Sequence, residues 1–492
     1  MSEVAPKTPE EWLRVLARRM DHRRSSVLLI RSYISGNAPL PEMSRETAEA
    51  WRMFQRKART NWGELIVDSV VDRVVPNGIT VGGETDSPSA KAAQRIWRKN
   101  RMNSVFKSWL RYGLTFGQSY LTVWDGGDGV IVTADSPETM IVITDPLQHW
   151  KPVAAMRVWR NDEEARDYAI VWTEGGWQQF TRPTYTKVEL RVIPSKWLVN
   201  LAEGSWTSDG QPSGVSRLGV AQPIPVVVYN NPGGHGDFET HIDLINRINA
   251  GILERLCISA VQAFRQRAIT GGMLPERDAD GNVIDYTKVF APAPGVLWNL
   301  PEGLDLWEST PVDLSGVLNA TKEDVRQLSA VTRTPLPMLM PDNANTSAEG
   351  ARETSSGHYF RCVDRLDEAK HGVELCMDLA IRLSGMATNP DEPVEVSFEP
   401  VDRITTAEKY QAALAAHNAG ESWKSIQRNI LGYSPDQIAQ DEIDRAEEAL
   451  MLATMMPQLA LPPGGQQPQP NTLSASGERM PTSFGGTQPG GR

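Results

Sequence analysis

Apolar residues recur at two different periods along the chain, and the change of period divides it into regions. A capping box at Thr8–Glu11, with proline at the first helical position, predicts a basic helix that runs toward Tyr33. Spacings of three and four residues predict further helices over Asn61–Val74 and Ala92–Leu114. The segment Ser119–Tyr229 instead holds short β-branched and aromatic runs, which predict mainly antiparallel strands. This part is therefore expected to be an α+β region.

The segment Gly236–Gly385 predicts a helical hairpin that returns to its own base. A broad apolar stripe predicts a first long helix, helix A, over 236–267, and a second stripe predicts helix B over 313–331. Helix A would be roughly 45 Å long. Its apolar arc is too broad to be buried against one neighbour, so a second helix or copies of the chain must cover it. The residues between the two helices, 268–312, hold short β-type runs around Tyr286–Phe290, Val296–Asn299 and Asp305–Trp307.

Prolines interrupt the helical pattern over 332–345. Three of them forbid a continuous helix there. Met338 and Met340 supply flexible apolar side chains to the same segment. The segment is therefore expected to be a loop that leads from helix B to the next helix.

A second capping box, Thr346–Glu349, begins a third long helix, helix C, within the segment 346–404. Glycines at Gly350, Gly357 and Gly372 favour a contact within the chain or with a neighbouring copy over a coiled-coil dimer. The two cysteines on the apolar seam of helix C are expected to be inert core thiols. The seam has spacings of three and four and consists of Tyr359, Cys362, Leu366, Ala369, Val373, Cys376, Ala380 and Leu383.

The C-terminal part contains a helical region and a tail. Residues 405–456 predict two or three helices, with breaks at Gly420 and Gly432. The last 36 residues, 457–492, include seven Pro, seven Gly and five Gln. That composition holds too little apolar material to offset the entropy of ordering, so a disordered tail is expected.

The net charge of the chain limits the kinds of molecule that it can bind tightly. Lys and Arg total 50 and Asp and Glu total 61, for a net charge of −11. Such a balance disfavours tight, sequence-independent binding to nucleic-acid phosphates. Residues 1–60 are nevertheless basic, with twelve Lys or Arg against seven Asp or Glu, whereas 401–456 carry five against nine. Opposite signs at the two ends suggest distinct faces for distinct partners.

The sequence holds only weak signals of an enzyme active site, a metal site or a membrane-spanning segment. The three cysteines form no CxxC pair, the histidines show no HExxH spacing, and no GxxxxGK[ST] sequence occurs. The acidic pairs lack a positioned partner for acid–base chemistry. No apolar run reaches the roughly 18–20 residues that a bilayer span requires. We expect a non-enzymatic protein without catalytic residues, metal, cofactor or membrane partner.

Six stretches in this order resemble bacteriophage portal proteins, specifically the SPP1-type siphophage portal family. The resemblance covers about residues 8–455. Each motif alone is weak, and their order makes the resemblance specific. The stretches are Arg31–Pro41, Asn61–Val81, Arg95–Trp124, Val132–Asp145, Pro223–Gly234 and Asn345–Glu353.

The resemblance implies an α+β portal fold and a ring-shaped homo-oligomer, typically a dodecamer. Residues 1–235 would form an α/β wing, helices A and B the stem, and 268–312 a small β-rich clip. Residues 332–345 would be the tunnel loop, 346–404 helix C and a strand that returns to the wing, and 405–456 a helical crown.

The function implied by the resemblance is a ring at a unique capsid vertex that encloses a channel for packaging and ejection of double-stranded DNA. The implied partners are further copies of the chain, double-stranded DNA without sequence preference, the terminase large subunit, a head–tail adaptor, and the major capsid and scaffolding proteins. The protein would be made in the bacterial host cytoplasm and reside in the virion.

Two groups of side chains become candidates for the channel surface. On the stem, Lys322 and Arg326 would form sparse positive rings, although an ordinary solvated face or a salt bridge with Glu323 or Asp324 explains the pair as well. In the tunnel loop the candidates are Arg333, Met338, Met340, Asn343 and Asn345.

Two other functions stay open at this point. A nuclease-like subunit of a packaging complex would require a clustered carboxylate or metal site. A capsid-associated structural protein outside the vertex would share the composition but would not need the stem hairpin.

Overall fold

The computed structural model describes residues 6–42, 45–184, 200–203, 205–210, 224–263, 267–273, 276–277, 281, 283–286, 303, 305–308, 310, 312–341, 348–385, 392–402 and 406–455. The chain divides into two units, Met1–Ala439 and Gln440–Arg492. No helix in the described ranges is long and apolar enough to cross a membrane.

The first helices begin largely where the sequence predicts them. In α1 (Pro9–Ile34) the Thr8 hydroxyl accepts from the Glu11 amide, and the Glu11 carboxylate accepts from the Thr8 amide, so the capping box is confirmed. Helices α2 (Arg45–Lys57) and α3 (Trp62–Val71) follow. The helical segment predicted over Ala92–Leu114 is confirmed, but it is not a single helix.

Two helices, α4 (Pro88–Lys99) and α5 (Met102–Phe116), make up that segment. Arg101 between them adopts a left-handed φ of 51°. The side chain of Asn100 donates to Val130 O and accepts from the Val132 amide. Because strand β3 holds Asn100 in this way, a tertiary contact overrides the local helical preference.

Antiparallel strands fill the region after α5, as predicted. The described sheet pairings here are all antiparallel. One sheet has the order β3-β2-β9 and the other β4-β5-β6-β7-β8. The run at 188–193 lies outside the described residues. The bounds are β2 (Gln118–Asp125), β3 (Val130–Asp135), β4 (Met140–Thr144), β5 (Pro152–Asn161), β6 (Arg166–Thr173), β7 (Gly176–Pro183), β8 (Thr207–Ser208) and β9 (Val226–Asn230).

Strand β7 escaped the sequence pattern because its composition is polar. Its buried Gln178 donates to Gly210 O and also pairs with the Ser208 hydroxyl. These two hydrogen bonds satisfy the side-chain nitrogen of Gln178 and help this polar residue take a core position.

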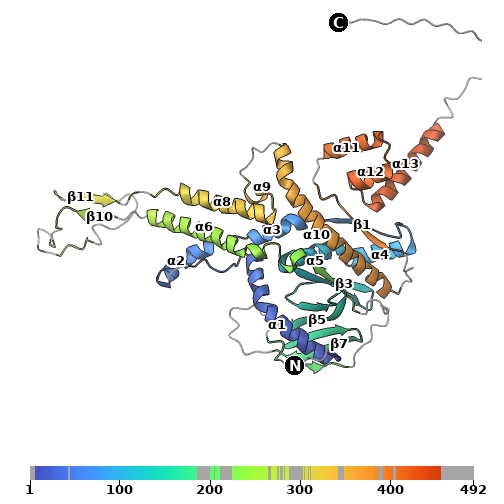
Figure 1. The fold of residues 1–492 in the computed structure, drawn as a ribbon, viewed down its shortest axis with the longest axis horizontal. Coiled ribbons are helices and arrows are strands. Elements are labelled where there is room, and N and C mark those ends of the chain that lie inside the picture. The colour runs from blue at the N-terminus through green and yellow to red at the C-terminus, as the bar shows by residue number, and fades with distance from the viewer. Residues whose placement is uncertain are drawn as a thin grey trace, which may run out of the picture. The chain divides into compact units, whose positions relative to one another are not determined.

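The two helices predicted to form the stem, here named the stem helices, lie antiparallel and side by side (Figure 1). Helix A of the sequence corresponds to α6 (Ile242–Ala263), and helix B to α8 (Ser315–Thr332). Helix A is shorter than predicted at both ends, with 22 residues or about 33 Å. A short 3₁₀ turn at Glu239–His241 replaces its predicted first turn, and another at Pro232–Gly234 precedes it. Its predicted last residue, Arg267, begins strand β10 instead.

Two short strands lie beyond the helices of the hairpin. β10 (Arg267–Thr270) pairs antiparallel with β11 (Asp305–Glu308). The strand predicted at Asp305–Trp307 is confirmed and β10 was missed. The other two predicted runs, around 286–290 and 296–299, fall almost entirely outside the described residues.

After α8 comes a single helical turn, α9 (Leu336–Leu339), and then α10 (Ala348–Leu383), which has 36 residues. The predicted capping residues Thr346 and Ser347 lie outside the described residues. β12 (Val394–Phe398) pairs with β1 (Pro76–Val81), which returns the chain to its N-terminal part.

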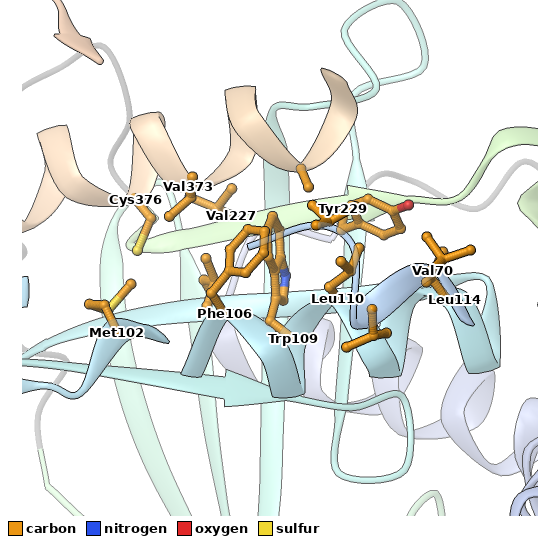
Figure 2. Close-up of a cluster of buried hydrophobic side chains, with 14 of the residues drawn as sticks. Val70, Met102, Phe106, Trp109, Leu110, Leu114, Val227, Tyr229, Val373 and Cys376 are labelled. Carbon is orange, nitrogen blue, oxygen red and sulfur yellow. The ribbon is translucent and has the colours of Figure 1, made fainter. Parts of the chain in front are cut away.

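The largest hydrophobic cluster joins α3, α4, α5, β2, β9 and α10 around Trp109 (Figure 2). Trp109 is fully buried and packs edge-on against Phe106 and Tyr229. A second cluster buries α1 against β4 to β7, and a third lies between the two sheets. The long helix α10 thus rests on the centre of the α+β region.

The C-terminal helices are α11 (Thr406–Asn418), α12 (Trp423–Ile426), a π-helical turn (Gln427–Leu431) and α13 (Pro435–Met455). Gly420 and Gly432 have φ values of 92° and 73°, so both predicted breaks are confirmed. The predicted disordered tail lies outside the described residues.

Candidate functional site

The stem hairpin is held together by a short apolar interface and by polar contacts beside it. Ile245 and Ile248 of α6 and Val325 and Leu328 of α8 are buried in the main cluster. A Cβ atom at Gly251 would lie 2.8 Å from Thr321 Oγ1, so this glycine permits the close approach of the two helices. The two helices therefore form one packed unit.

An ion pair and a hydrogen bond also join the two helices. Arg247 lies 2.9 Å from Asp324 and donates to Gln327. These contacts are only partly buried, so they set the alignment of the helices more than their stability.

The two candidate cations of the stem are both exposed on α8. Arg326 lies 3.2 Å from Glu323, one turn earlier on the same helix, and Asp324 is engaged by Arg247. Lys322 forms no salt bridge with any part of the chain that the structure describes. Lys322 is therefore the more available cation of the two.

The proline-rich segment places its candidates in different environments. Arg333 is exposed and caps α8 in a left-handed conformation with a φ of 50°. Met338 is 38% exposed, whereas Met340 packs against the main hydrophobic cluster. Asn343 and Asn345 lie outside the described residues. Of the two methionines, Met338 is the one on the surface.

The seam of helix C is mostly a core feature of the single chain. Val373, Leu383 and both of its cysteines are buried, and Leu366 is partly buried. Tyr359 departs from the seam because it is 38% exposed and packs edge-on against the exposed Phe360. Burial raises the pKa of Cys362 to about 11 and that of Cys376 to about 12, so neither thiol ionises at neutral pH.

A buried ion cluster at the base of the stem was not predicted. Asp237, just before α6, lies 2.6 Å from Arg361 and 3.0 Å from Arg365 of α10, and its side chain is 1% exposed. Burial alone would raise the pKa of Asp237, but the charges of the two arginines outweigh it and hold that pKa below its usual value. The Asn231 amide also donates to this carboxylate. The cluster fastens the stem base to α10.

A histidine lies beside the cluster on the same helix. The Nδ1 and Nε2 atoms of His358 lie 3.2 Å from Arg333 O and 3.1 Å from Ser69 O. Burial, and then the charges of Arg361 and Arg73, lower the pKa of His358 to about 4. The imidazole is therefore neutral at pH 7 and donates to only one of the two carbonyl groups at a time.

The sequence held one signal for this cluster. His358, Arg361 and Arg365 follow one another at spacings of three and four, so they form a polar stripe beside the apolar seam of helix C. Their carboxylate partner stands more than a hundred residues earlier in the chain, and no periodicity links it to them.

The described residues offer no candidate metal centre. Within the described ranges, no three His, Cys, Asp or Glu side chains are grouped so that they could hold a metal ion. The buried charges of the cluster are paired with one another, and this arrangement fits a structural joint.

A family model settles the class of the protein. The model described as "Phage portal protein, SPP1 Gp6-like" matches residues 13–450. The chain belongs to this family of phage portal proteins. As a portal protein it is a structural component of a bacteriophage virion, of the head–tail connector kind.

Solved structures with a similar fold include chains of gene transfer agent (GTA) particles. A chain from the virion of a native GTA particle has 15% sequence identity and a TM-score of 0.42, covering 83% of this chain and 99% of that one. Chains from the neck of an empty particle, computed with C6 symmetry, and of a native particle, computed with C12 symmetry, have 14% and 13% identity. Their TM-scores are 0.42 and 0.40, and each match covers 82% of this portal protein and 98% of the other chain. The comparison with curated proteins gives no match.

Proposed function

We propose that this portal protein assembles as a homo-oligomeric ring of twelve copies at a unique capsid vertex. The supporting observation is a largely apolar groove at the base of the hairpin, of about 620 Å³, between α6 and α8. Leu244, Ala330 and Val331 line it together with the polar Asp243, Arg247 and Gln327, and Val331 is 51% exposed. A single copy leaves this groove open to water, and an adjacent stem in a ring would cover it.

The ring encloses a channel through which double-stranded DNA enters during packaging and leaves during ejection. A channel must let the duplex slide, and every phosphate neutralised by Lys or Arg adds a term that holds the duplex in place. A net charge of −11 per copy keeps that term small. Among the candidate side chains, Lys322 of the stem and Met338 of the loop are best suited to touch the duplex without holding it in place.

Each region of the chain forms a different part of the ring. Residues 1–235 form the wing, 236–267 and 313–331 the stem, 332–345 the tunnel loop, 346–404 helix C and the strand that returns to the wing, and 405–456 the crown. Residues 268–312 form the clip, which meets the terminase large subunit and later a head–tail adaptor. Major capsid and scaffolding proteins contact the ring as the head assembles in the host cytoplasm.

The tunnel loop provides the test of the channel. Deleting Met338–Asn343 lowers the amount of DNA packaged or retained per head; because the deletion also removes Met340 from the main cluster, the ring yield of the variant is measured beside its DNA content. Leu147→Ser, at an 88% exposed residue of the β4–β5 loop in the wing, is the control and leaves DNA content unchanged. Normal DNA content in heads built with the deletion variant would refute the loop assignment.

A further inference from the structure

Three consecutive carbonyl groups at the end of α8 are engaged by side chains of α8 and α10. Thr332 O accepts from Arg361 Nη1 at 2.7 Å. Arg333 O lies 3.2 Å from His358 Nδ1. Thr334 O accepts from the Ser329 hydroxyl at 2.7 Å. The chain therefore leaves the stem through a backbone that is held at three successive residues, which are the first three of the tunnel loop.

Arg361 joins these carbonyls to the rest of the stem base. The same guanidinium donates to Thr334 Oγ1 at 3.1 Å, to Ile66 O at 3.2 Å and to Asp237 at 2.6 Å. Arg361 is 5% exposed, so none of these contacts is exchanged easily for water. One side chain thus connects α3, the start of the outgoing stem helix and the end of the returning one.

The contacts of His358 complement those of Arg361. With its proton on Nδ1, the imidazole donates to Arg333 O and Nε2 accepts from the Cys362 thiol 3.5 Å away, and Ser69 O then receives no proton from Nε2. Arg333 itself is in the left-handed region, which a non-glycine residue adopts only where its surroundings hold it. The held backbone conformation sets the direction in which the loop departs.

We infer that Arg361 and His358 are positioning residues for the tunnel loop. They fix residues 332–334 to α10 and to the stem base, so that the loop from Pro335 onward changes position only together with the stem. This inference rests on the proposed function in one respect: the loop is taken to face the DNA channel.

Arg365 supplies a matched control. It lies one turn further along α10 and binds the same carboxylate, Asp237, at 3.0 Å. None of the hydrogen bonds described for it reaches residues 332–334. Changing Arg365 therefore disturbs the ion cluster and leaves the carbonyl contacts in place.

Hydrogen exchange of the purified full-length protein tests the inference. A lysine at position 361 keeps a positive charge beside Asp237 but cannot serve four acceptors. In Arg361→Lys, the amides of Thr334, Met338 and Met340 exchange at least about tenfold faster, as expected for the loss of a charge-assisted hydrogen bond. In Arg365→Lys they exchange at the wild-type rate. Equal exchange in the two variants overturns the inference.

His358→Asn keeps the test decisive if Arg361→Lys fails to fold, because it takes the imidazole away from Arg333 O. The same three amides then exchange several-fold faster, and an unchanged rate overturns the inference.

The link to DNA has a separate readout. Heads built with Arg361→Lys lose packaged DNA, and heads built with Arg365→Lys keep it; equal retention refutes the link to DNA. The exchange result does not depend on ring formation or DNA. A failure of the proposed function is therefore distinguishable from a failure of the positioning role inferred for Arg361 and His358.

Discussion

The close approach of α10 to the centre of the fold depends on Gly372. A Cβ atom at this position would lie 2.5 Å from Cη2 of Trp109 and 2.9 Å from its Cζ2. The indole is fully buried between Phe106 and Tyr229, with ring centroids 5.8 and 5.5 Å away. Figure 2 shows Trp109 below α10, the helix that carries Gly372 and the labelled Val373. We predict that Gly372→Ala destabilises the protein.

A second glycine of α10 gives the control. At Gly357 no atom lies within 4 Å of the position that a Cβ would take. Alanine in place of glycine stabilises a helix interior by about 0.5–1 kcal/mol, and this gain applies to both sites. Overpacking a close contact costs about 1–3 kcal/mol. The gain cancels when the variants are compared, so Gly372→Ala should be less stable than Gly357→Ala by about 1–3 kcal/mol.

Urea denaturation followed by tryptophan fluorescence measures the difference. The reasoning requires equal m-values in the two variants, so that the shift in midpoint reports stability. Equal stability of the two alanine variants would show that α10 does not rest on Trp109 at this distance.

The remaining predictions concern buried charge. The neutral His358 takes up its proton near pH 4 when folded and near 6.5 when unfolded, so about 3 kcal/mol of stability present above pH 6.5 is lost as the pH falls toward 4. His358→Asn should lose less over that range in urea denaturation at stepped pH, and an identical pH profile would contradict the assignment. Val373→Asp should abolish ring assembly, measured as ring yield, because it buries an unpaired charge. Leu366→Asp should have a weaker effect, because Leu366 is only partly buried. A normal ring yield for Val373→Asp would show that Val373 is not a core residue. Asp167→Asn should cost about 3–5 kcal/mol in urea denaturation, because it removes the buried carboxylate that pairs with Arg160 and Arg182, and a loss below about 1 kcal/mol would argue against the pairing.

Local chemistry made part of the fold predictable. The Thr8–Glu11 capping box and the breaks at Gly420 and Gly432 depend on a few neighbouring residues, and the structure confirms them. Along the apolar seam of helix C, Cys362, Val373 and Cys376 are buried, whereas Tyr359 is 38% exposed. In each of these cases the deciding contacts lie within one element or on one face of it.

Contacts between distant parts of the chain account for the errors. Asn100 is held by β3, which breaks a helix that local pattern would continue. Asp237 was assigned to helix A by its position, but the structure places it in an ion cluster with Arg361. The ion cluster at the stem base could not be predicted, because residue 237 and helix C are far apart in the sequence and no periodicity relates them.

Cryo-electron microscopy of the purified protein tests the central claim most directly. The account predicts a closed ring of twelve copies, with α6 and α8 of every copy around an open axial channel and each stem groove covered by the next copy. Particles that are monomeric at all concentrations, or a ring in which the stem hairpins point away from the axis, would contradict it.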